Sequence, residues 1–452
     1  MSSRHTIYAL ASGPPPAGVA VIRLSGSATE AALAALGVSG LIPRKASLRR
    51  LSDPHSEQFL DDALVIWFPK PASFTGEDVA ELHLHGGRAV IDAVTTALSR
   101  VPGMVPAEPG EFTRRAFENG KLDLTQAEGI ADLVDAETQA QRRQALRQTE
   151  GELGALYEDW RSVLVRALAY LEADIDFAED EALPSGLADT VVAGLRDLRR
   201  SVADHLDDGH RGERLRDGVY VVIAGPPNAG KSSLLNALAK REAAIVSALA
   251  GTTRDVIEVH LDLGGVAVIV ADTAGLRQAD DEGAGEIERE GVRRALERAG
   301  TADLKIVVTD ALSWPTVDHQ TFDIIDENTF VVVNKIDLCA VDPDAQLAGK
   351  AVYPVSVLRG DGLADLVSAL AQVVGERYGL SAAPGLTRQR HRAALQDCLE
   401  ALDRYLKVHN LAAVELAAED LRLAAQALGR ITGRVDVEDL LDIVFKDFCI
   451  GK

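Results

Sequence analysis

The chain has 452 residues, 47% of them hydrophobic and 26% charged, with a formal net charge of −22. This length predicts about three domains, whereas the absence of a long apolar run argues against a transmembrane helix or a signal peptide. Three cysteines argue against a disulfide framework and favour the cytoplasm, and the acidic balance argues against broad contact with nucleic acid except through a basic partner or a local basic patch.

Residues 1–118 combine strand patterns with helical ones. Short runs of β-branched and alternating residues predict strands, and apolar residues at helical spacing predict helices. The predicted elements are strands at 19–24, 62–68 and 79–84 and helices around 31–36 and 90–98. This mixture predicts an α+β N-terminal domain.

Residues 119–216 change to a helical period. Apolar side chains recur at helical spacing over 153–171 and again over 187–206. Core packing between long helices is enough to explain both stripes. We therefore expect the first part of a helical middle domain here.

Residues 217–380 alternate strands and helices. The expected strands are 219–224, 266–271, 304–308, 330–333 and 351–355. This alternation predicts a doubly wound, mostly parallel sheet that binds its ligand at the carboxyl ends of the strands. Residues 381–452 are helical again, so the α/β domain is expected to be inserted into a split helical domain.

The segment 225–232 reads Gly-Pro-Pro-Asn-Ala-Gly-Lys-Ser between a predicted strand and a predicted helix. This context is that of a phosphate-binding loop, whose backbone N–H groups surround the phosphates of a nucleotide. Lys231 is expected to reach the β- and γ-phosphates, and Ser232 to hold Mg²⁺.

Further motifs follow in order, each near a predicted strand end. Asp272 suits a contact to the metal shell and Gly275 the γ-phosphate, while the carboxylate of Asp337 can accept hydrogen bonds from guanine N1–H and its 2-amino group. Adenine lacks this pair of donors, so GTP is favoured over ATP. The predicted GTP-binding residues are Asn228, Ala229, Gly230, Lys231, Ser232, Ser233, Asp272, Thr273, Ala274, Gly275, Asn334, Lys335, Asp337, Ser356, Val357 and Leu358.

The residue after Gly275 is Leu276, where many small GTPases carry the glutamine that orients the attacking water. A leucine side chain cannot form a hydrogen bond, so another group must orient the water. Spacing alone leaves the acidic residues of 280–282 and 286–290 open as candidates.

The two ends of the chain resemble the MnmE family, also called TrmE, of tRNA-modification GTPases. The matching segments are 18–26, 73–82, 85–87, 109–117, 121–128 and the terminal Phe-Cys-Ile-Gly-Lys of 448–452. Era-like GTPases share the central motifs but neither end. Pro226, the insertion-like stretch between Gly275 and Glu288, and Pro14–Ala17 depart from the family pattern.

The resemblance implies a homodimer that works with MnmG, also called GidA, an FAD protein, in a heterotetramer or larger complex. Together they would place an aminomethyl or carboxymethylaminomethyl group on C5 of the wobble uridine of tRNA. The one-carbon unit would come from 5-formyl- or methylene-tetrahydrofolate, and the tRNA would be bound through the complex.

The resemblance also assigns residues. Arg23, Glu81, Lys121 and Lys452 fall on the family's folate-binding positions. The cations suit the carboxylates of the folate, and the carboxylate suits the amino-pyrimidine edge of the pterin. The N-terminal domain would bind folate and dimerise.

In the G domain, the resemblance implies a K⁺ ion in place of an arginine finger. The K⁺ ligands would be Asn228, Ser247, Leu249 and Thr252, with Ser232 and Thr253 on Mg²⁺ and Glu288 positioning the water. This gives Glu288 and Lys231 as the catalytic residues of GTP hydrolysis.

Cys449 lies near the end of the chain, beside Lys452, which could lower its pKa. A role as nucleophile or acid in the tRNA chemistry is a hypothesis, whereas Cys398 lies in a helical stripe and suits a buried position. His83 and His85 share one strand face without nearby ligands, so no transition metal is expected.

Two other functions stay open: an Era-like regulatory GTPase of ribosome assembly, and a folate-dependent transferase with a structural nucleotide.

Overall fold

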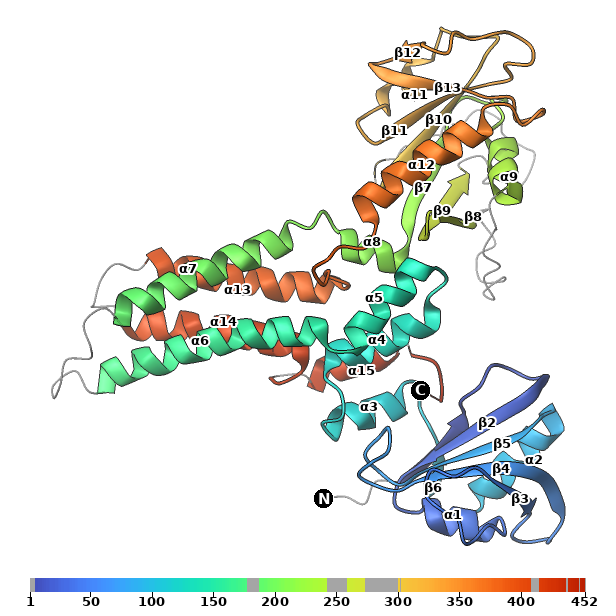
Figure 1. Cartoon of the computed structure of the whole chain (residues 1–452), viewed down its shortest axis with the longest axis vertical. Helices are drawn as coiled ribbons and strands as arrows, with labels where there is room; N and C mark the ends of the chain where they lie inside the picture. Colours follow the sequence, from blue (N-terminus) through green and yellow to red (C-terminus); the bar gives the residue numbers. More distant parts are fainter. Residues whose placement is uncertain are drawn as a thin grey trace, which may run out of the picture. The chain divides into compact units, whose positions relative to one another are not determined.

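The computed structural model describes residues 5–176, 187–241, 258–272, 300, 302–407, 414–435, 438–446 and 448–451 (Figure 1). The chain divides into two compact units, which are described separately. The first contains Met1–Ala131, Gln148–Leu195 and Glu400–Lys452, and the second contains Asp132–Arg147 and Arg196–Leu399. The four domain ranges expected from the sequence remain a prediction.

The first unit begins with a six-stranded sheet, which confirms the α+β character expected for its N-terminal part. Its strands, in spatial order, are β3 (Ser47–Ser52), β4 (Phe59–Phe68), β5 (Val79–Gly86), β2 (Ala17–Ser25), β1 (Thr6–Leu10) and β6 (Met104–Pro106). Neighbours are antiparallel except for the parallel pair β1 and β6. The three strands predicted from the sequence are β2, β4 and β5.

Helices cover the two faces of this sheet unequally. Helices α1 (Thr29–Ala35) and α2 (Arg88–Ser99) bury apolar side chains against one face. Helix α3 (Glu111–Glu118) contributes Phe112 to a smaller cluster with Ile7 and Ala9 of β1. The opposite face of β3, β4 and β5 therefore keeps exposed side chains.

The rest of the first unit is helical, as the 3.6-residue apolar period predicts. Its helices are α4 (Leu124–Asp135), α6 (Glu152–Asp176), α14 (Val414–Thr432) and α15 (Glu438–Lys446). Helix α6 packs along α14, with Tyr157 and Leu164 buried on α6 and Leu421 and Leu428 buried on α14. No described helix is long and apolar enough to cross a membrane.

Helix α4 passes into the second unit after Ala131, and three further helices also contribute residues to both units. They are α5 (Gln139–Thr149), α7 (Leu187–Leu206) and α13 (Gln389–Lys407). In the second unit, Asp132 accepts ion-pair contacts from Arg216 at 3.0 Å and from Arg388 at 2.6 Å. These contacts fix the start of α13 beside α8 (Arg211–Asp217).

The second unit contains a seven-stranded sheet that confirms the predicted mostly parallel architecture (Figure 1). Its order is β12 (Gln346–Leu347), β13 (Lys350–Pro354), β11 (Thr329–Asn334), β10 (Leu304–Asp310), β7 (Val219–Ala224), β9 (Val266–Asp272) and β8 (Glu258–Leu263). Edge strands β8 and β12 are antiparallel to their neighbours, and all other neighbouring pairs are parallel. Parallel strands are buried on both faces, which explains their nearly continuous Val and Ile runs.

Helices α9 (Lys231–Arg241) and α12 (Leu363–Tyr378) pack on this sheet, and the short α11 (His319–Asp323) follows β10. Leu234 and Leu366, one from each larger helix, are fully buried in the same cluster as Val221 and Ile306. Both helices therefore pack on the same face of the sheet, and the carboxyl ends of the parallel strands β7, β9, β10 and β11 lie at one edge.

Candidate active site

The loop between β7 and α9 is shaped by two glycines. Gly225 has a φ of +141°, and a methyl group there would lie 2.1 Å from the carbonyl oxygen of Val308. Gly230 has a φ of +98°, and a methyl group there would lie 2.2 Å from Nδ2 of Asn334. Only glycine fits both positions, so the phosphate loop is held between two neighbouring strand ends.

Lys231 and Ser232 open α9 at the end of this loop. The Lys231 ammonium donates to the carbonyl oxygens of Gly225 at 2.8 Å and Pro226 at 2.9 Å. The Ser232 hydroxyl donates to the carboxylate of Asp272, the last residue of β9. A hydroxyl beside a carboxylate offers the oxygen ligands that Mg²⁺ prefers, so these two residues fit the predicted metal.

Asn334 and Lys335 connect the base-recognition segment to the phosphate loop. The Asn334 amide donates to the Ala229 carbonyl at 2.9 Å, and its oxygen accepts from the backbone N–H groups of Lys335 and Val357 at 2.8 and 3.2 Å. The Lys335 ammonium donates to the Asn228 carbonyl at 2.9 Å and pairs with Asp310 at 2.5 Å. The two loops are therefore braced against each other.

Asp337 is oriented by the segment that follows β13. The hydroxyl of buried Ser356 donates to the Asp337 carboxylate at 2.6 Å. This hydrogen bond lowers the pKa of Asp337 below its ordinary range, so the carboxylate is ionised and accepts hydrogen bonds. Val357 is partly buried beside it, whereas the Leu358 side chain is 87% exposed.

Several predicted site residues lie outside the described residues, and their assignments stay predictions. They are Ser247, Leu249, Thr252, Thr253, Thr273, Ala274, Gly275, Leu276, Glu288 and Lys452.

Two of the four predicted folate-binding residues form an ion pair in the N-terminal sheet. Arg23 and Glu81 are opposite each other in β2 and β5, with two guanidinium nitrogens 3.0 and 3.1 Å from one carboxylate oxygen. The Arg23 guanidinium also lies 5.9 Å from the ring centre of Phe74 and 5.8 Å from that of Phe112. Lys121 lies near the loop between β4 and β5 that carries Phe74, since its ammonium donates to the Pro71 carbonyl of that loop at 3.3 Å.

The C-terminal segment 448–451 lies against the N-terminal domain. Pro109 and Ile450 form an antiparallel bridge, and the Gly110 N–H donates to the Cys449 carbonyl at 3.3 Å. Arg23 reaches the Gly451 carbonyl at 3.5 Å. The structure thus joins the predicted folate pair and the Cys449 segment, which are far apart in the sequence.

The three cysteines differ in exposure. Cys339 and Cys449 are exposed, whereas Cys398 is fully buried in α13, as its helical stripe predicts. Burial raises the pKa of the Cys398 thiol from 9.0 to about 12. That thiol is therefore neutral and unreactive at ordinary pH.

The two strand histidines contact carboxylates. His83 Nε2 lies 3.4 Å from Glu81, and His85 Nδ1 lies 2.7 Å from buried Asp61. His85 also donates its backbone N–H to Asp61 at 2.8 Å. These contacts are those of side chains that orient a strand end.

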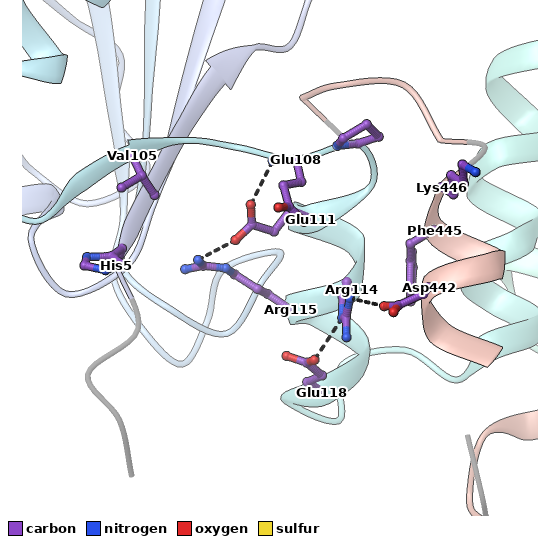
Figure 2. A pocket seen from close by; sticks show the side chains of 11 residues that line it. His5, Val105, Glu108, Glu111, Arg114, Arg115, Glu118, Asp442, Phe445 and Lys446 are labelled. Carbon is purple, nitrogen blue, oxygen red and sulfur yellow. Dashed lines mark hydrogen bonds and ion pairs between the residues drawn. The ribbon is translucent and has the colours of Figure 1, made fainter. Parts of the chain in front are cut away.

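A cavity of about 580 Å³, which the sequence does not predict, lies between α3 and α15 (Figure 2). Arg115 is buried and pairs with Glu77 at 3.0 Å and Glu111 at 2.7 Å, while Arg114 pairs with Asp442 of α15 at 2.8 Å. Figure 2 shows Arg114 directed across the cavity toward Asp442. Ion pairs thus line the space next to the C-terminal segment.

Sequence reasoning missed some residues of both sites. Asp310 ends β10 and pairs with Lys335, and a polar residue at a strand end is the same signal that identified Asp272 and Asn334. Gly110 and Phe74 lie within matched family segments, but their roles depend on contacts with distant residues that spacing does not reveal.

Comparisons with known proteins find similarity over nearly the whole chain. The family model described as "MnmE helical domain" matches residues 124–449, and the model "GTP-binding protein TrmE N-terminus" matches residues 6–121. A protein of Paramagnetospirillum magneticum named "tRNA modification GTPase MnmE" is 59% identical over 449 residues, covering 99% of this chain and 100% of that protein. A protein of the same name from Parvibaculum lavamentivorans is 58% identical over 454 residues, covering 99% of this chain and all of its own length.

A human relative is similar over nearly the same extent. It is named "5-taurinomethyluridine-[tRNA] synthase subunit GTPB3, mitochondrial" and is 49% identical over 470 residues. The match covers 100% of this chain and 94% of that protein. Full-length similarity at these identities, together with the guanine-nucleotide geometry of the second unit, shows that the chain belongs to the MnmE family of tRNA modification GTPases.

Proposed function

We propose that this GTPase acts with an FAD-containing partner protein to place a carboxymethylaminomethyl or aminomethyl group on C5 of the wobble uridine in tRNA. GTP hydrolysis drives the cycle, and a tetrahydrofolate derivative supplies the one-carbon unit. The observation that carries this proposal is the contact between two distant segments, in which Arg23 of the predicted folate pair reaches the backbone beside Cys449.

The nucleotide site supports GTP as the substrate. The Asp337 carboxylate is ionised and fixed by Ser356, and a carboxylate can accept both donors on the guanine edge. Ser232 and Thr253 would hold Mg²⁺, which neutralises charge on the phosphates when bound, and Asp272 contacts the Ser232 hydroxyl. Lys231 lies on the loop at the point from which its ammonium can turn toward the β- and γ-phosphates.

Hydrolysis in this proposal depends on two groups of the chain besides Lys231. Glu288 positions the attacking water, in place of the glutamine that Leu276 replaces. Asn228 contributes a K⁺ ligand with Ser247, Leu249 and Thr252. The Asn228 side chain is exposed while its carbonyl is fixed by Lys335, so its amide oxygen is free to face a cation.

The N-terminal domain supports the folate part of the proposal. The Arg23 guanidinium is paired with Glu81 and lies 5.9 Å from the ring centre of Phe74 and 5.8 Å from that of Phe112, and Lys121 contacts the loop between β4 and β5. Cations next to an aromatic ring suit an anionic ligand with a flat ring system. Cys449 acts beside this site as nucleophile or acid in the tRNA chemistry.

The homodimer in this proposal forms through the uncovered face of the N-terminal sheet. Leu48, Leu64, His83 and Val21 are opposite one another across four adjacent strands. Leu48 is 65% exposed and Leu64 is 47% exposed. Two exposed leucines side by side on an uncovered sheet face are typical of a surface that a second copy covers.

GTP turnover in potassium and sodium salts tests the hydrolysis mechanism. A cation beside the bridging oxygen neutralises developing charge, so we expect turnover in K⁺ to exceed that in Na⁺ on the order of tenfold or more. Asn228→Ala should remove the difference while leaving GDP affinity within about twofold, because the Asn228 carbonyl that Lys335 contacts remains. Equal turnover of the natural chain in both salts would argue against the ion site.

A further inference from the structure

We propose that Gly110 is a positioning residue for tRNA modification, since it holds the segment 448–451, and with it the exposed Cys449 side chain, in one fixed place against the N-terminal domain. The proposal rests on the role assigned to Cys449 under the proposed function.

Gly110 fits the segment because it has no side chain. It caps the N-terminus of α3 with a φ of +68°, and its N–H donates to the Cys449 carbonyl at 3.3 Å. A methyl group at this position would lie 2.7 Å from the Phe445 carbonyl oxygen and 3.0 Å from the Phe448 Cβ. Both distances are shorter than van der Waals contact, so a larger residue must displace the segment.

The C-terminal end of the segment 448–451 is also held by a close contact at a glycine. Gly451 has a φ of +98°, and a methyl group there would lie 2.3 Å from the Leu10 carbonyl oxygen. Its own carbonyl faces Arg23 at 3.5 Å. Cys449 therefore lies between two close backbone contacts with its carbonyl engaged by Gly110 and its side chain exposed.

Helix α15 anchors the segment from its N-terminal side. Phe445 and Phe448 are buried with ring centres 5.2 Å apart, and both pack in one cluster with Leu124. Asp442 pairs with Arg114 of α3 at 2.8 Å beside the cavity of about 580 Å³ (Figure 2). Because open space rather than close packing lies beside α3 and α15, a methyl at Gly110 should shift the segment without unfolding the domain.

The test compares Gly110→Ala and Gly451→Ala with Gly40→Ala in the full chain with its partner protein. Gly40 is the matched control, because its φ is +65° but a methyl group there would meet no atom within 4 Å. We expect kcat for tRNA modification to fall about tenfold or more in the first two variants, with KM for tRNA and GTP turnover within about twofold. The control should modify tRNA normally.

A thiol-reactivity measurement separates positioning from general destabilisation. In a Cys339→Ser background Cys449 is the one exposed cysteine among the described residues, since Cys398 is buried. We expect Cys449 to react faster with a disulfide reagent in Gly110→Ala than in Gly40→Ala, because the segment is released. If Gly110→Ala fails to fold, Asp442→Asn replaces it, and the loss of one partly exposed ion pair should lower kcat a few-fold.

The outcomes distinguish this inference from the proposed function. Suppose that Cys449→Ser is inactive in modification but normal in GTP turnover. Normal modification by Gly110→Ala then overturns the inference. If Gly110→Ala does not fold, normal modification by Asp442→Asn overturns it. Normal modification by Cys449→Ser instead overturns the role of Cys449. A lowered kcat with unchanged thiol reactivity would also contradict the positioning role of Gly110.

Discussion

Asn334 does most to connect the two parts of the nucleotide site. Its amide group bonds the phosphate loop at Ala229, while its oxygen holds Lys335 and Val357 on the base side. Gly230 has to be glycine because this amide lies where its Cβ would be. A substitution in either loop is therefore expected to disturb both halves of GTP binding.

At this scale the sequence predicted residue types better than contacts. Asp337 and Ser356 were expected at one site because each follows a predicted strand, and a 2.6 Å hydrogen bond joins them, while their part in guanine recognition stays a prediction. The contacts of Gly110, Asp310 and Phe74 could not be predicted. They depend on residues brought together by the fold, and no local pattern reports them.

Asp337→Asn should change the base preference of the site. An asparagine amide can donate where the carboxylate accepts, so it suits xanthine, whose C2 carries an oxygen in place of the guanine amino group. We expect GTP affinity to fall roughly 100-fold and affinity for xanthosine triphosphate to rise, since hydrogen bonds to charged groups are worth about 1.5–3 kcal/mol each.

Competition binding with both nucleotides measures this change. Asp344→Asn is the control, because Asp344 donates its backbone N–H to Asp342 and is not one of the predicted nucleotide-site residues. Unchanged GTP affinity in Asp337→Asn would contradict guanine recognition by this carboxylate.

At the scale of elements, burial decided which strands could be predicted. Strands β7, β9, β10 and β11 are central and parallel, so continuous β-branched runs reveal them. Edge strand β3 carries Arg49 and Arg50, and β6 has three residues, so neither has a clear apolar pattern. Strand β8 alternates as Glu-Val-His-Leu-Asp-Leu and carries the signal that would have predicted it.

Helix α12 should be important for the stability of the second unit. Leu366 is fully buried against the sheet, so Leu366→Ala should lower the free energy of unfolding of this unit by about 3 kcal/mol through lost burial and a cavity. Leu312→Ala is the control, because Leu312 is 66% exposed and should cost less than about 0.5 kcal/mol.

Urea unfolding followed by tryptophan fluorescence can report on this unit separately. Trp67 and Trp160 belong to the first unit and Trp314 to the second, so Phe at 67 and 160 leaves Trp314 as the reporter. Equal midpoints for Leu366→Ala and Leu312→Ala would contradict the packing described for α12.

For the whole molecule, the sequence indicated an α+β region, helical regions and a doubly wound α/β region. The two sheets and the long helices confirm this fold class. The insertion of the α/β domain could be inferred because helical periodicity stops before residue 217 and resumes after 380. The division into units could not be predicted from periodicity, because α7 and α13 each continue from one unit into the other.

The uncovered face of the N-terminal sheet predicts that the chain forms a homodimer. Leu48→Glu combined with Leu64→Glu places like charges on the proposed dimer surface, so we expect light scattering to give the mass of one chain in place of two. Leu416→Glu is the control, since Leu416 is 68% exposed on α14. A dimer of unchanged stability in the double variant would require another interface.

We propose that GTP recognition by this chain supports modification of the wobble uridine. Mass analysis of tRNA nucleosides from cells that lack the chain, and from the same cells carrying either the natural chain or Asp337→Asn, tests it most directly. We expect the C5-modified uridine to be absent without the chain, restored by the natural chain, and not restored by Asp337→Asn. Normal amounts of that nucleoside in cells without the chain would contradict it.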